Sequence, residues 1–157
     1  PRSLASDGPV QIDWTDPAQF SDIRFSGNRW EAQRGNWAQQ LAQHLQTRAV
    51  AQLPAGETLQ VTFTDIKRAG QFEPWRGPNL QDTRIVREIY PPHIELSFKR
   101  LDAQGNVIDQ GERRLRDSGF MMGASSVMNS DPLRFEKRML DDWLRRELRA
   151  DAALSVR

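Results

Sequence analysis

The sequence predicts an α+β fold with two layers, a mixed sheet of about five strands with two main helices packed on one face. Three patterns carry this prediction. A strand, a helix and a strand follow one another in the first half of the chain, an alternating hairpin comes later, and a helix with a wide apolar face closes the chain. We expect a single domain over residues 10–149, a flexible N-terminus at residues 1–9 and a frayed C-terminus at residues 150–157.

The first strand is predicted from strict alternation of apolar and polar residues between Val10 and Trp14, and Asp16-Pro17 ends it. A loop is expected over residues 18–27. The same alternation returns over residues 58–66 after a helix. This order predicts a crossover that joins two parallel strands.

The helix between these strands is predicted over residues 28–53. Asn28 and Glu31 have the spacing of a capping box at its start. Gly35 in the first turns costs about 1 kcal/mol relative to alanine, which favours a start nearer Asn36. An apolar ladder at every fourth position gives the helix one buried stripe, formed by Trp37, Leu41, Leu45 and Ala49.

The second half of the chain predicts a hairpin and a closing helix. Alternating residues from Ile94 to Phe98 and a polar return over residues 107–116 flank a turn-forming cluster, and the return strand is expected at a wet edge. Residues 118–129 form a loop rich in methionine, which is either an adaptable contact surface or, as we favour, core filler. Asp131 and Pro132 then predict the start of the closing helix.

Composition excludes several classes of function. The 157 residues carry a net charge of +1, which gives little general attraction to nucleic acid, and they contain no cysteine for disulfides, thiol chemistry or Cys-ligated metals. We predict no transmembrane segment, because no apolar run approaches the ~18–20 residues that span a bilayer. The sequence shows no phosphate loop, nucleophile elbow or other cofactor motif, so no cofactor is predicted.

Few side chains suit catalysis or metal binding. His44 and His93 are far apart in the sequence and neither forms a two-histidine metal spacing, so we predict no metal site. Asp13 and Asp16 flank a tryptophan, as paired carboxylates of a hydrolase can. We favour the simpler interpretation, in which Asp16 is a turn residue and Asp13 lies on a solvated face.

Residues 72–92, FEPWRGPNLQDTRIVREIYPP, are the most unusual part of the chain, and we call them the central segment. Irregular stretches of this length inside compact domains are usually functional or disordered, and the aromatic residues argue against disorder. Guanidinium groups can fork two bonds to a carboxylate or phosphate and can stack on rings. The candidate binding residues are therefore Trp75, Arg76, Arg84, Arg87 and Tyr90.

A purely structural interpretation of the central segment competes with this one. Glu73, Asp82 and Glu88 are close enough in sequence to neutralise the arginines, and Trp75 could simply pin the segment to the sheet. A short strand within residues 84–90 is also compatible with the pattern.

Three motifs, FEPWR, RIVREIYPP and DPLRFEKRMLDDW, resemble a bacterial family, the domain-of-unknown-function family numbered 3016. The resemblance extends over nearly the whole chain after Pro9. It implies an exported, periplasmic protein whose signal peptide has been removed. The start at Pro1 fits this, and it equally fits a chain trimmed for another reason. The resemblance implies no activity, and no catalytic or binding residue follows from it.

Two hypotheses of function follow. The first is a periplasmic binding or protein-interaction module that uses the central segment to contact a protein or a small anionic ligand. The second is a metal-free enzyme for an anionic small substrate, with Arg84 and Arg87 as the anion clamp and Tyr90, His93 or Asp65 as acid or base. Whether the protein is an enzyme is left open by the sequence, as is its oligomeric state.

Overall fold

The computed structural model describes residues 2–5, 8–122 and 130–155, with side chains described as far as residue 148. Four strands form the main sheet: β1 (Val10–Trp14), β2 (Thr58–Lys67), β5 (His93–Leu101) and β6 (Val107–Arg116). Their order is β1-β2-β5-β6, with β1 parallel to β2 and the other neighbours antiparallel. The predicted parallel pair and the predicted hairpin are both confirmed.

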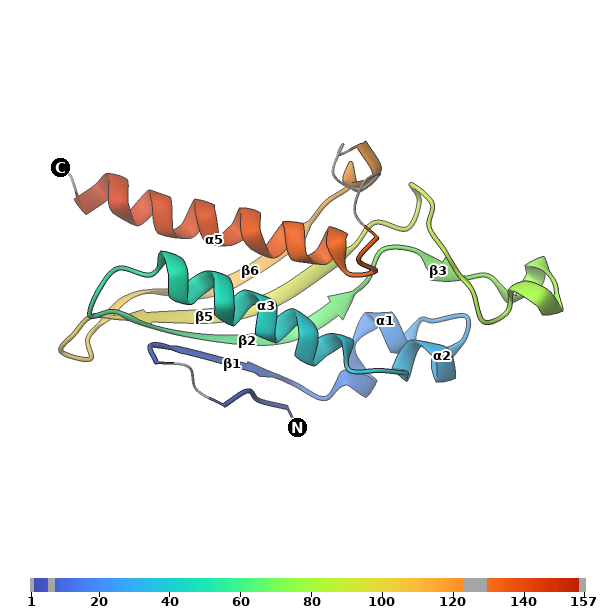
Figure 1. Cartoon of the computed structure of the whole chain (residues 1–157), viewed down its shortest axis with the longest axis horizontal. Helices are drawn as coiled ribbons and strands as arrows, with labels where there is room; N and C mark the ends of the chain where they lie inside the picture. The colour runs from blue at the N-terminus through green and yellow to red at the C-terminus, as the bar shows by residue number, and fades with distance from the viewer. Residues whose placement is uncertain (1, 6–7, 123–129, 156–157) are drawn as a thin grey trace.

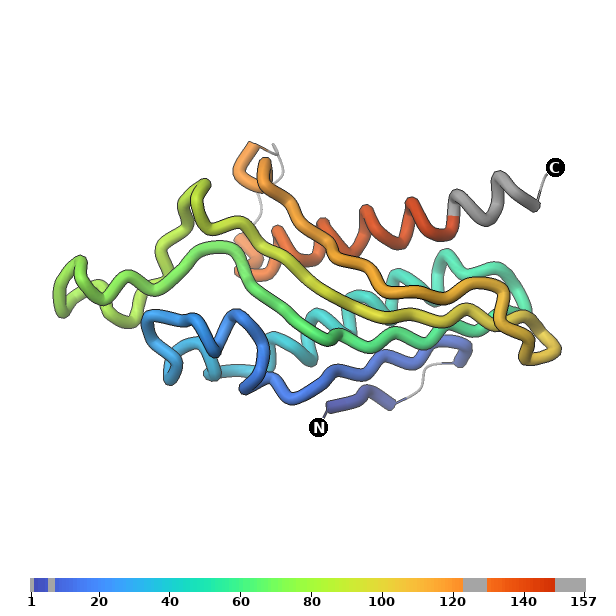
Figure 2. The backbone as a smooth tube through the Cα atoms, turned by 180° about the vertical axis from the view of Figure 1, so that it is seen from behind, coloured from blue at the N-terminus to red at the C-terminus, as the bar shows by residue number. Residues whose placement is uncertain are grey.

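Two long helices, α3 (Trp37–Gln52) and α5 (Arg134–Ser155), cover one face of this sheet (Figure 1). The opposite face of the sheet is open, as the view from behind shows (Figure 2). The fold is therefore α+β with two layers, as predicted. Within the described residues the main sheet has four strands, and β3 (Gln71–Phe72) and β4 (Arg84–Ile85) make a separate two-stranded ribbon at the base of the central segment.

The alternation in the sequence places the core between the sheet and the helices. β1, for example, buries Val10, Ile12 and Trp14 against the helices and turns its other residues outward. α3 contributes the predicted stripe, and α5 contributes Leu140, Trp143 and Leu144. Trp143 meets Phe98 of β5 edge to face, with ring centroids 5.6 Å apart, which fastens α5 to the sheet.

The predicted helix over residues 28–53 is two helices rather than one. Asn28 caps α2 (Arg29–Gln33) by accepting the Glu31 N–H at 3.2 Å, as the capping-box spacing predicts. Gly35 then adopts a φ of +81°, a left-handed conformation that stops the first helix, and α3 begins at Trp37. Glycine therefore breaks the helix outright instead of only weakening it.

The predicted loop over residues 18–27 also contains short helical turns. Asp16 accepts the Ala18 N–H at 3.0 Å and so starts η1 (Pro17–Gln19), which is the turn role expected of it. α1 (Ser21–Arg24) follows, and its first N–H is held by Asp65 of β2 at 2.6 Å. A helix of this length has no stability of its own, so the contact with β2 fixes it.

The N-terminal residues, for which the sequence predicts a flexible segment, run antiparallel beside β1, with Leu4 donating to Ile12 O at 3.1 Å. β6 is the exposed edge strand that its polar sequence predicts. Within the predicted methionine loop, Phe120 of η4 (Phe120–Met122) is buried and Met122 is exposed, while Met128 falls outside the described residues.

Candidate interaction surface

Residues 68–71 lead from the end of β2 into the central segment, which extends beyond the end of the main sheet as an arm and returns to the sheet at β5 (Figure 1, Figure 2). The β3–β4 ribbon forms its base. Two short turns, η2 (Pro74–Arg76) and η3 (Pro78–Leu80), form its outer part. The segment is therefore a folded structure with internal pairing.

A carboxylate at the base of the arm organises three of the predicted binding residues. The side chain of Glu73 is completely buried, and it accepts hydrogen bonds from Arg76, from Arg87 at 3.1 Å and from the Tyr90 hydroxyl at 2.5 Å. The bond from Tyr90, followed by those from the two arginines, holds the pKa of Glu73 below its ordinary value, and the same bond raises the pKa of Tyr90. Glu73 is therefore an ionised carboxylate that holds three side chains together, and two of these, Arg76 and Arg87, remain partly exposed to solvent.

A second buried carboxylate, Asp22 of α1, joins the arm to the main body. It accepts the Arg68 backbone N–H and the Arg68 guanidinium, both at 2.8 Å, and Arg84 at 3.3 Å. Arg68 also lies over the indole of Trp37 at 4.2 Å, and Arg84 lies over the ring of Phe72 at 4.8 Å. Arg84 is thus used to fasten the segment rather than to face a ligand.

The α1–α2 connection packs directly against the arm. Gly27 donates to Gln71 at 3.2 Å, and Asn28 donates to the Gln81 carbonyl at 3.0 Å and to Asp82 at 3.1 Å. A Cβ at Gly27 would lie 2.3 Å from the carbonyl oxygen of Phe72, so only glycine permits this approach. The two segments are therefore packed together at one end of the molecule.

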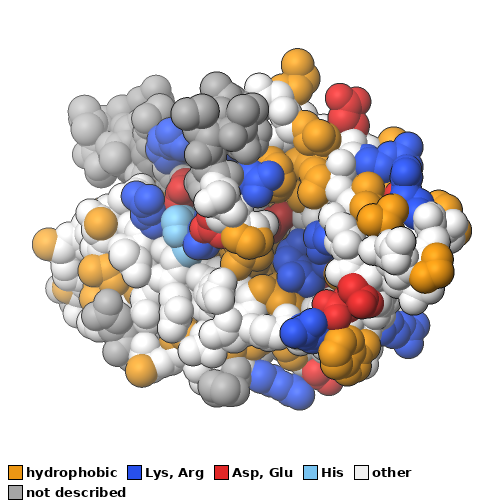
Figure 3. Space-filling model, turned by 45° about the vertical axis from the view of Figure 1, so that its right-hand side comes forward, with side chains coloured by type: hydrophobic (Ala, Val, Ile, Leu, Met, Phe, Trp, Pro, Cys, Tyr) orange, Lys and Arg blue, Asp and Glu red, His pale blue; other side chains and the backbone are white. Residues whose placement is uncertain are grey.

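Large apolar side chains are exposed at this end and form what we call the distal surface. The exposed fractions are 71% for Trp75, 69% for Trp30, 66% for Phe25 and 63% for Ile89. Leu80 and Val86, also in the central segment, are exposed to a smaller degree, and we include them in the distal surface. In Figure 3, which brings this end forward, hydrophobic and basic side chains gather over it.

Arginines accompany the exposed rings of the distal surface. Arg24 lies over Phe25 at 5.2 Å and Arg34 over Trp30 at 5.1 Å. The exposed charged residues at this end are Arg24, Arg29, Arg34, Arg76 and Arg87 against Asp82 and Glu88. The solvent-facing charge of the surface is therefore mainly positive, because Glu73 is buried beneath it.

The structure distributes the five predicted binding residues over three settings. Arg76, Arg87 and Tyr90 converge on Glu73, Arg84 turns inward to Asp22, and Trp75 stands in solvent without pinning the segment to the sheet. Sequence reasoning missed Asp22 as an anchor and missed Phe25 and Trp30 as part of the surface. No local pattern announces them, since the contacts that bring them here join distant parts of the chain.

The residues required by the enzyme hypothesis do not share one site. Arg84 pairs with Asp22, whereas Arg87 pairs with Glu73. The Tyr90 hydroxyl donates to Glu73. Asp65 accepts the Ser21 hydroxyl at 2.6 Å and contacts His93 at 3.1 Å. Burial would raise the pKa of Asp65, but the hydrogen bonds from His93 and Ser21 outweigh it and hold that pKa low.

The order of this Ser21–Asp65–His93 group matters for its chemistry. A histidine that activates a serine stands between the hydroxyl and the carboxylate. Here the carboxylate stands between the other two, so the hydroxyl proton is held by Asp65 and is not shared with His93. The described residues contain no group of three or more His, Cys, Asp or Glu side chains that could hold a metal ion.

Two further ionisable groups lie buried where the arm meets β2 and α5. Glu136 of α5 accepts the Ala69 N–H at 2.8 Å, and burial raises its pKa to about 7 against the effect of that bond. Lys67 donates to the carbonyls of Arg68 and Gly70, both at 2.6 Å, and burial lowers its pKa to about 8. These groups fix the backbone that enters the central segment.

Comparison with known proteins identifies the family. The model of the family described as Protein of unknown function (DUF3016) matches residues 8–146. The chain belongs to this family. The resemblance seen in the three sequence motifs is thereby confirmed. No curated protein and no solved structure matches the chain. Among the described residues, no helix is long and apolar enough to cross a membrane.

Proposed function

We propose that the protein is a non-catalytic interaction module that binds a partner protein through the distal surface. The observation that carries the proposal is the set of large, strongly exposed apolar side chains at one end of the domain. Large apolar side chains that are exposed together at one end of a domain often mark a place of interaction. Tryptophan and arginine, both present here, are the residue types that dominate binding energy at protein interfaces.

The charges of the surface indicate what kind of partner fits. The exposed arginines outnumber the exposed acids, and two of them, Arg24 and Arg34, lie over exposed rings. A partner that offers apolar pockets with acidic groups around them would cover the rings and pair with the arginines. The buried Glu73 holds Arg76 and Arg87 in place before binding, which lowers the entropy lost on association.

An enzyme acting on an anionic substrate has less support. It needs an anion clamp and an acid or base at one point, whereas Arg84, Arg87 and His93 are engaged by Asp22, Glu73 and Asp65 respectively. We further propose, from the family resemblance, that the module is exported to the periplasm. Fractionation of cells that make the full-length precursor, followed by mass measurement of the mature N-terminus, tests the location.

Site-specific photocrosslinking tests the interaction. A photoreactive amino acid replaces Trp75 in one variant and Val107 in a control variant. Val107 is also exposed but lies on the β5–β6 hairpin (Figure 1). In the cells that make the protein, position 75 is expected to give discrete adducts of defined mass, and position 107 is not.

A competition step makes the result specific. Excess unlabelled protein should suppress the adducts, and the same protein with Trp30→Ala and Ile89→Asp should do so at least about tenfold less well, as expected for the loss of contact residues near a hot spot. The proposal is overturned if positions 75 and 107 give the same adducts, or if neither gives any. It is also overturned if the substituted competitor suppresses the adducts as well as the unsubstituted one. Both substituted side chains are exposed, so the competitor is expected to remain folded.

A further inference from the structure

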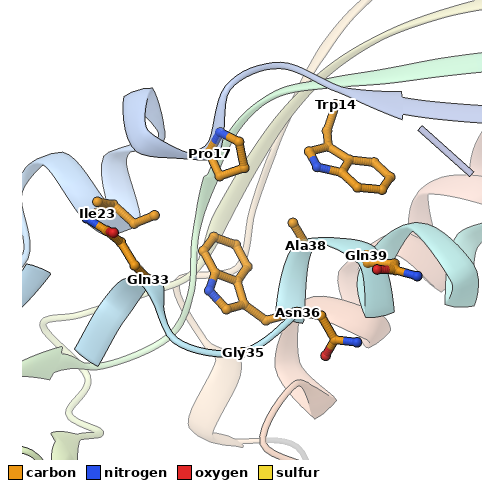
Figure 4. A pocket seen from close by; sticks show the side chains of 9 residues that line it. Trp14, Pro17, Ile23, Gln33, Gly35, Asn36, Ala38 and Gln39 are labelled. Carbon is orange, nitrogen blue, oxygen red and sulfur yellow. The ribbon is translucent and has the colours of Figure 1, made fainter. Parts of the chain in front are cut away.

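A separate pocket opens between the end of β1, η1 and the α2–α3 connection (Figure 4). Its volume is about 240 Å³. The residues that line it and that the argument uses are Trp14, Pro17, Gln33, Asn36, Trp37 and Gln39. None of the residues lining the pocket carries an ionisable side chain, so the pocket offers nothing to balance a charge on a ligand.

The pocket combines an apolar floor with carboxamides at its rim. The floor consists of parts of Trp14 and Trp37, together with Pro17 and aliphatic neighbours. Gln33 and Gln39 stand at the rim, and neither carboxamide has a hydrogen-bond partner among the residues that the structure describes. Apolar walls with a few convergent polar groups are the usual composition of a small-molecule site.

The two indole N–H groups differ in a way that points to a ligand. Trp37 donates to the Ala32 carbonyl at 2.9 Å. Most of Trp14 is buried, but its N–H has no acceptor within the described part of the chain and is not one of the buried polar atoms there, so it reaches solvent; its ring lies beside Pro17 and Ala38 at the pocket (Figure 4). The Trp14 N–H is therefore a free donor at the pocket, and an acceptor on a ligand that enters the pocket can bind it.

The walls are held in position before any ligand arrives. Trp37 is covered on one side by Arg68 at 4.2 Å and contacts Phe20 with ring centroids 6.2 Å apart. Asn36 accepts from Gln40 at 2.6 Å, which fixes the turn that follows Gly35. A preformed site of this kind loses little conformational entropy when it is filled.

We propose that this pocket binds one ring of a neutral saccharide. A sugar ring carries neighbouring hydroxyls that each donate and accept, which matches the paired donor and acceptor of a glutamine carboxamide. A ring oxygen or hydroxyl accepts from Trp14, and the C–H surface of the ring lies against the indoles and Pro17. The absence of ionisable groups in the lining selects neutral sugars over amino sugars and uronic acids. The inference stands independently of the distal surface.

The indole N–H resonances provide a direct readout. The chain has five tryptophans, so the five indole signals of nitrogen-15-labelled protein can each be assigned from a Trp→Phe variant. The probes are glucose, N-acetylglucosamine and their β-1,4-linked trisaccharides, with glucuronic acid and glucosamine as charged counterparts. We expect the neutral probes to shift the Trp14 signal, to leave Trp75 and Trp143 unmoved, and to bind at least about tenfold more tightly than the charged ones.

Two variants test the polar groups. Trp14→Phe keeps most of the ring but removes the donor, and binding followed by the Trp37 signal should weaken about tenfold or more. Gln33→Leu keeps the bulk of an exposed rim residue and should weaken binding without affecting folding, whereas the matched variant Gln43→Leu on the exposed side of α3 should change nothing. The proposal is overturned if ~50 mM sugar, well above the dissociation constants of millimolar sites, leaves Trp14 unshifted. It is equally overturned if Trp30 or Trp75 shifts instead, or if the charged probes bind as well.

Discussion

The Glu136→Gln substitution is expected to stabilise the protein at pH 7.5 and to remove part of its pH dependence. Glu136 is completely buried in the first turns of α5, where one carboxylate oxygen accepts the Ala69 N–H at 2.8 Å. The other oxygen is buried without a hydrogen-bond partner in the described structure. A charged carboxylate in this setting is expensive, which is why burial raises its pKa.

The size of the effect follows from the pKa. Burial raises the pKa of Glu136 from 4.5 to about 7. At about 1.36 kcal/mol for each pH unit, this difference corresponds to roughly 3 kcal/mol of unfolding free energy. Between the two pKa values the folded protein keeps a proton that the unfolded chain has released, so the stability contributed by this group falls as the pH rises from 4.5 to 7.

Glutamine keeps the acceptor for Ala69 and cannot ionise. Its two amide N–H groups lack acceptors there, which offsets part of the benefit, so we expect a net gain of about 1–2 kcal/mol at pH 7.5. At pH 5, where Glu136 is mostly protonated, the substitution should be neutral or slightly destabilising. Lys67, Arg68 and Asp22 interact electrostatically with this site and remain in both proteins, so the difference between the two reports Glu136.

The assay is urea unfolding at intervals between pH 5 and pH 8 for the natural protein and the variant. Glu88→Gln, which removes an exposed carboxylate of the central segment, controls for the change in net charge. If the unfolding free energies of the natural protein and Glu136→Gln run parallel over this range, Glu136 does not titrate near neutrality in the folded state and the reasoning is wrong.

Two further substitutions test how the arm is attached. Asp22→Asn leaves Arg68 and Arg84 without their shared counter-charge. Because both guanidinium groups keep some contact with solvent, we expect the unfolding free energy measured in urea to fall by about 2–3 kcal/mol, less than the 3–5 kcal/mol typical of fully buried pairs. A fall of under about 1 kcal/mol would contradict the anchoring role of Asp22. Gly27→Ala places a Cβ 2.3 Å from the Phe72 carbonyl oxygen, so the α1–α2 connection must move away from the arm. Trypsin should then cleave the central segment faster than in the natural protein, while the far-ultraviolet circular dichroism spectrum stays unchanged. Equal cleavage rates in the two proteins would show that the contact is not rigid.

The main sheet could be predicted from the sequence because each of its strands has a pattern that is visible within a few neighbouring residues. Alternation of apolar and polar residues depends only on which face is buried, and it identified β1, β2, β5 and β6; the order of the elements then predicted the β1–β2 and β5–β6 pairs but not the β2–β5 pair. The short elements had no such signal. α1 exists because Asp65 holds its first N–H, and the β3–β4 ribbon has only two residues in each strand, too few for a period to be seen.

The candidate site was predictable only in part for the same reason. The grouping of Arg76, Arg87 and Tyr90 is local, and Glu73 was visible as a nearby acid that neutralises them. The partner of Arg84 was not, since Asp22 lies 62 residues away in the sequence. The exposure of Trp30 could not be predicted either, because an aromatic residue in a short helix is typical of the core. Only the tertiary packing leaves Trp30 in solvent.

Three buried carboxylates explain how an irregular segment can carry a rigid surface. Asp22 belongs to α1, Glu73 to the central segment and Glu136 to α5, and each holds a backbone N–H or a guanidinium group at or near the base of the arm. Buried charges add little net stability compared with apolar packing, so their concentration here is better explained by the geometry they impose. Hydrogen bonds to fixed carboxylates restrict the rotamers and backbone that lead to the exposed Trp75 and Ile89. A partner would then meet rings already held in place, which is the condition under which exposed apolar area contributes most to affinity.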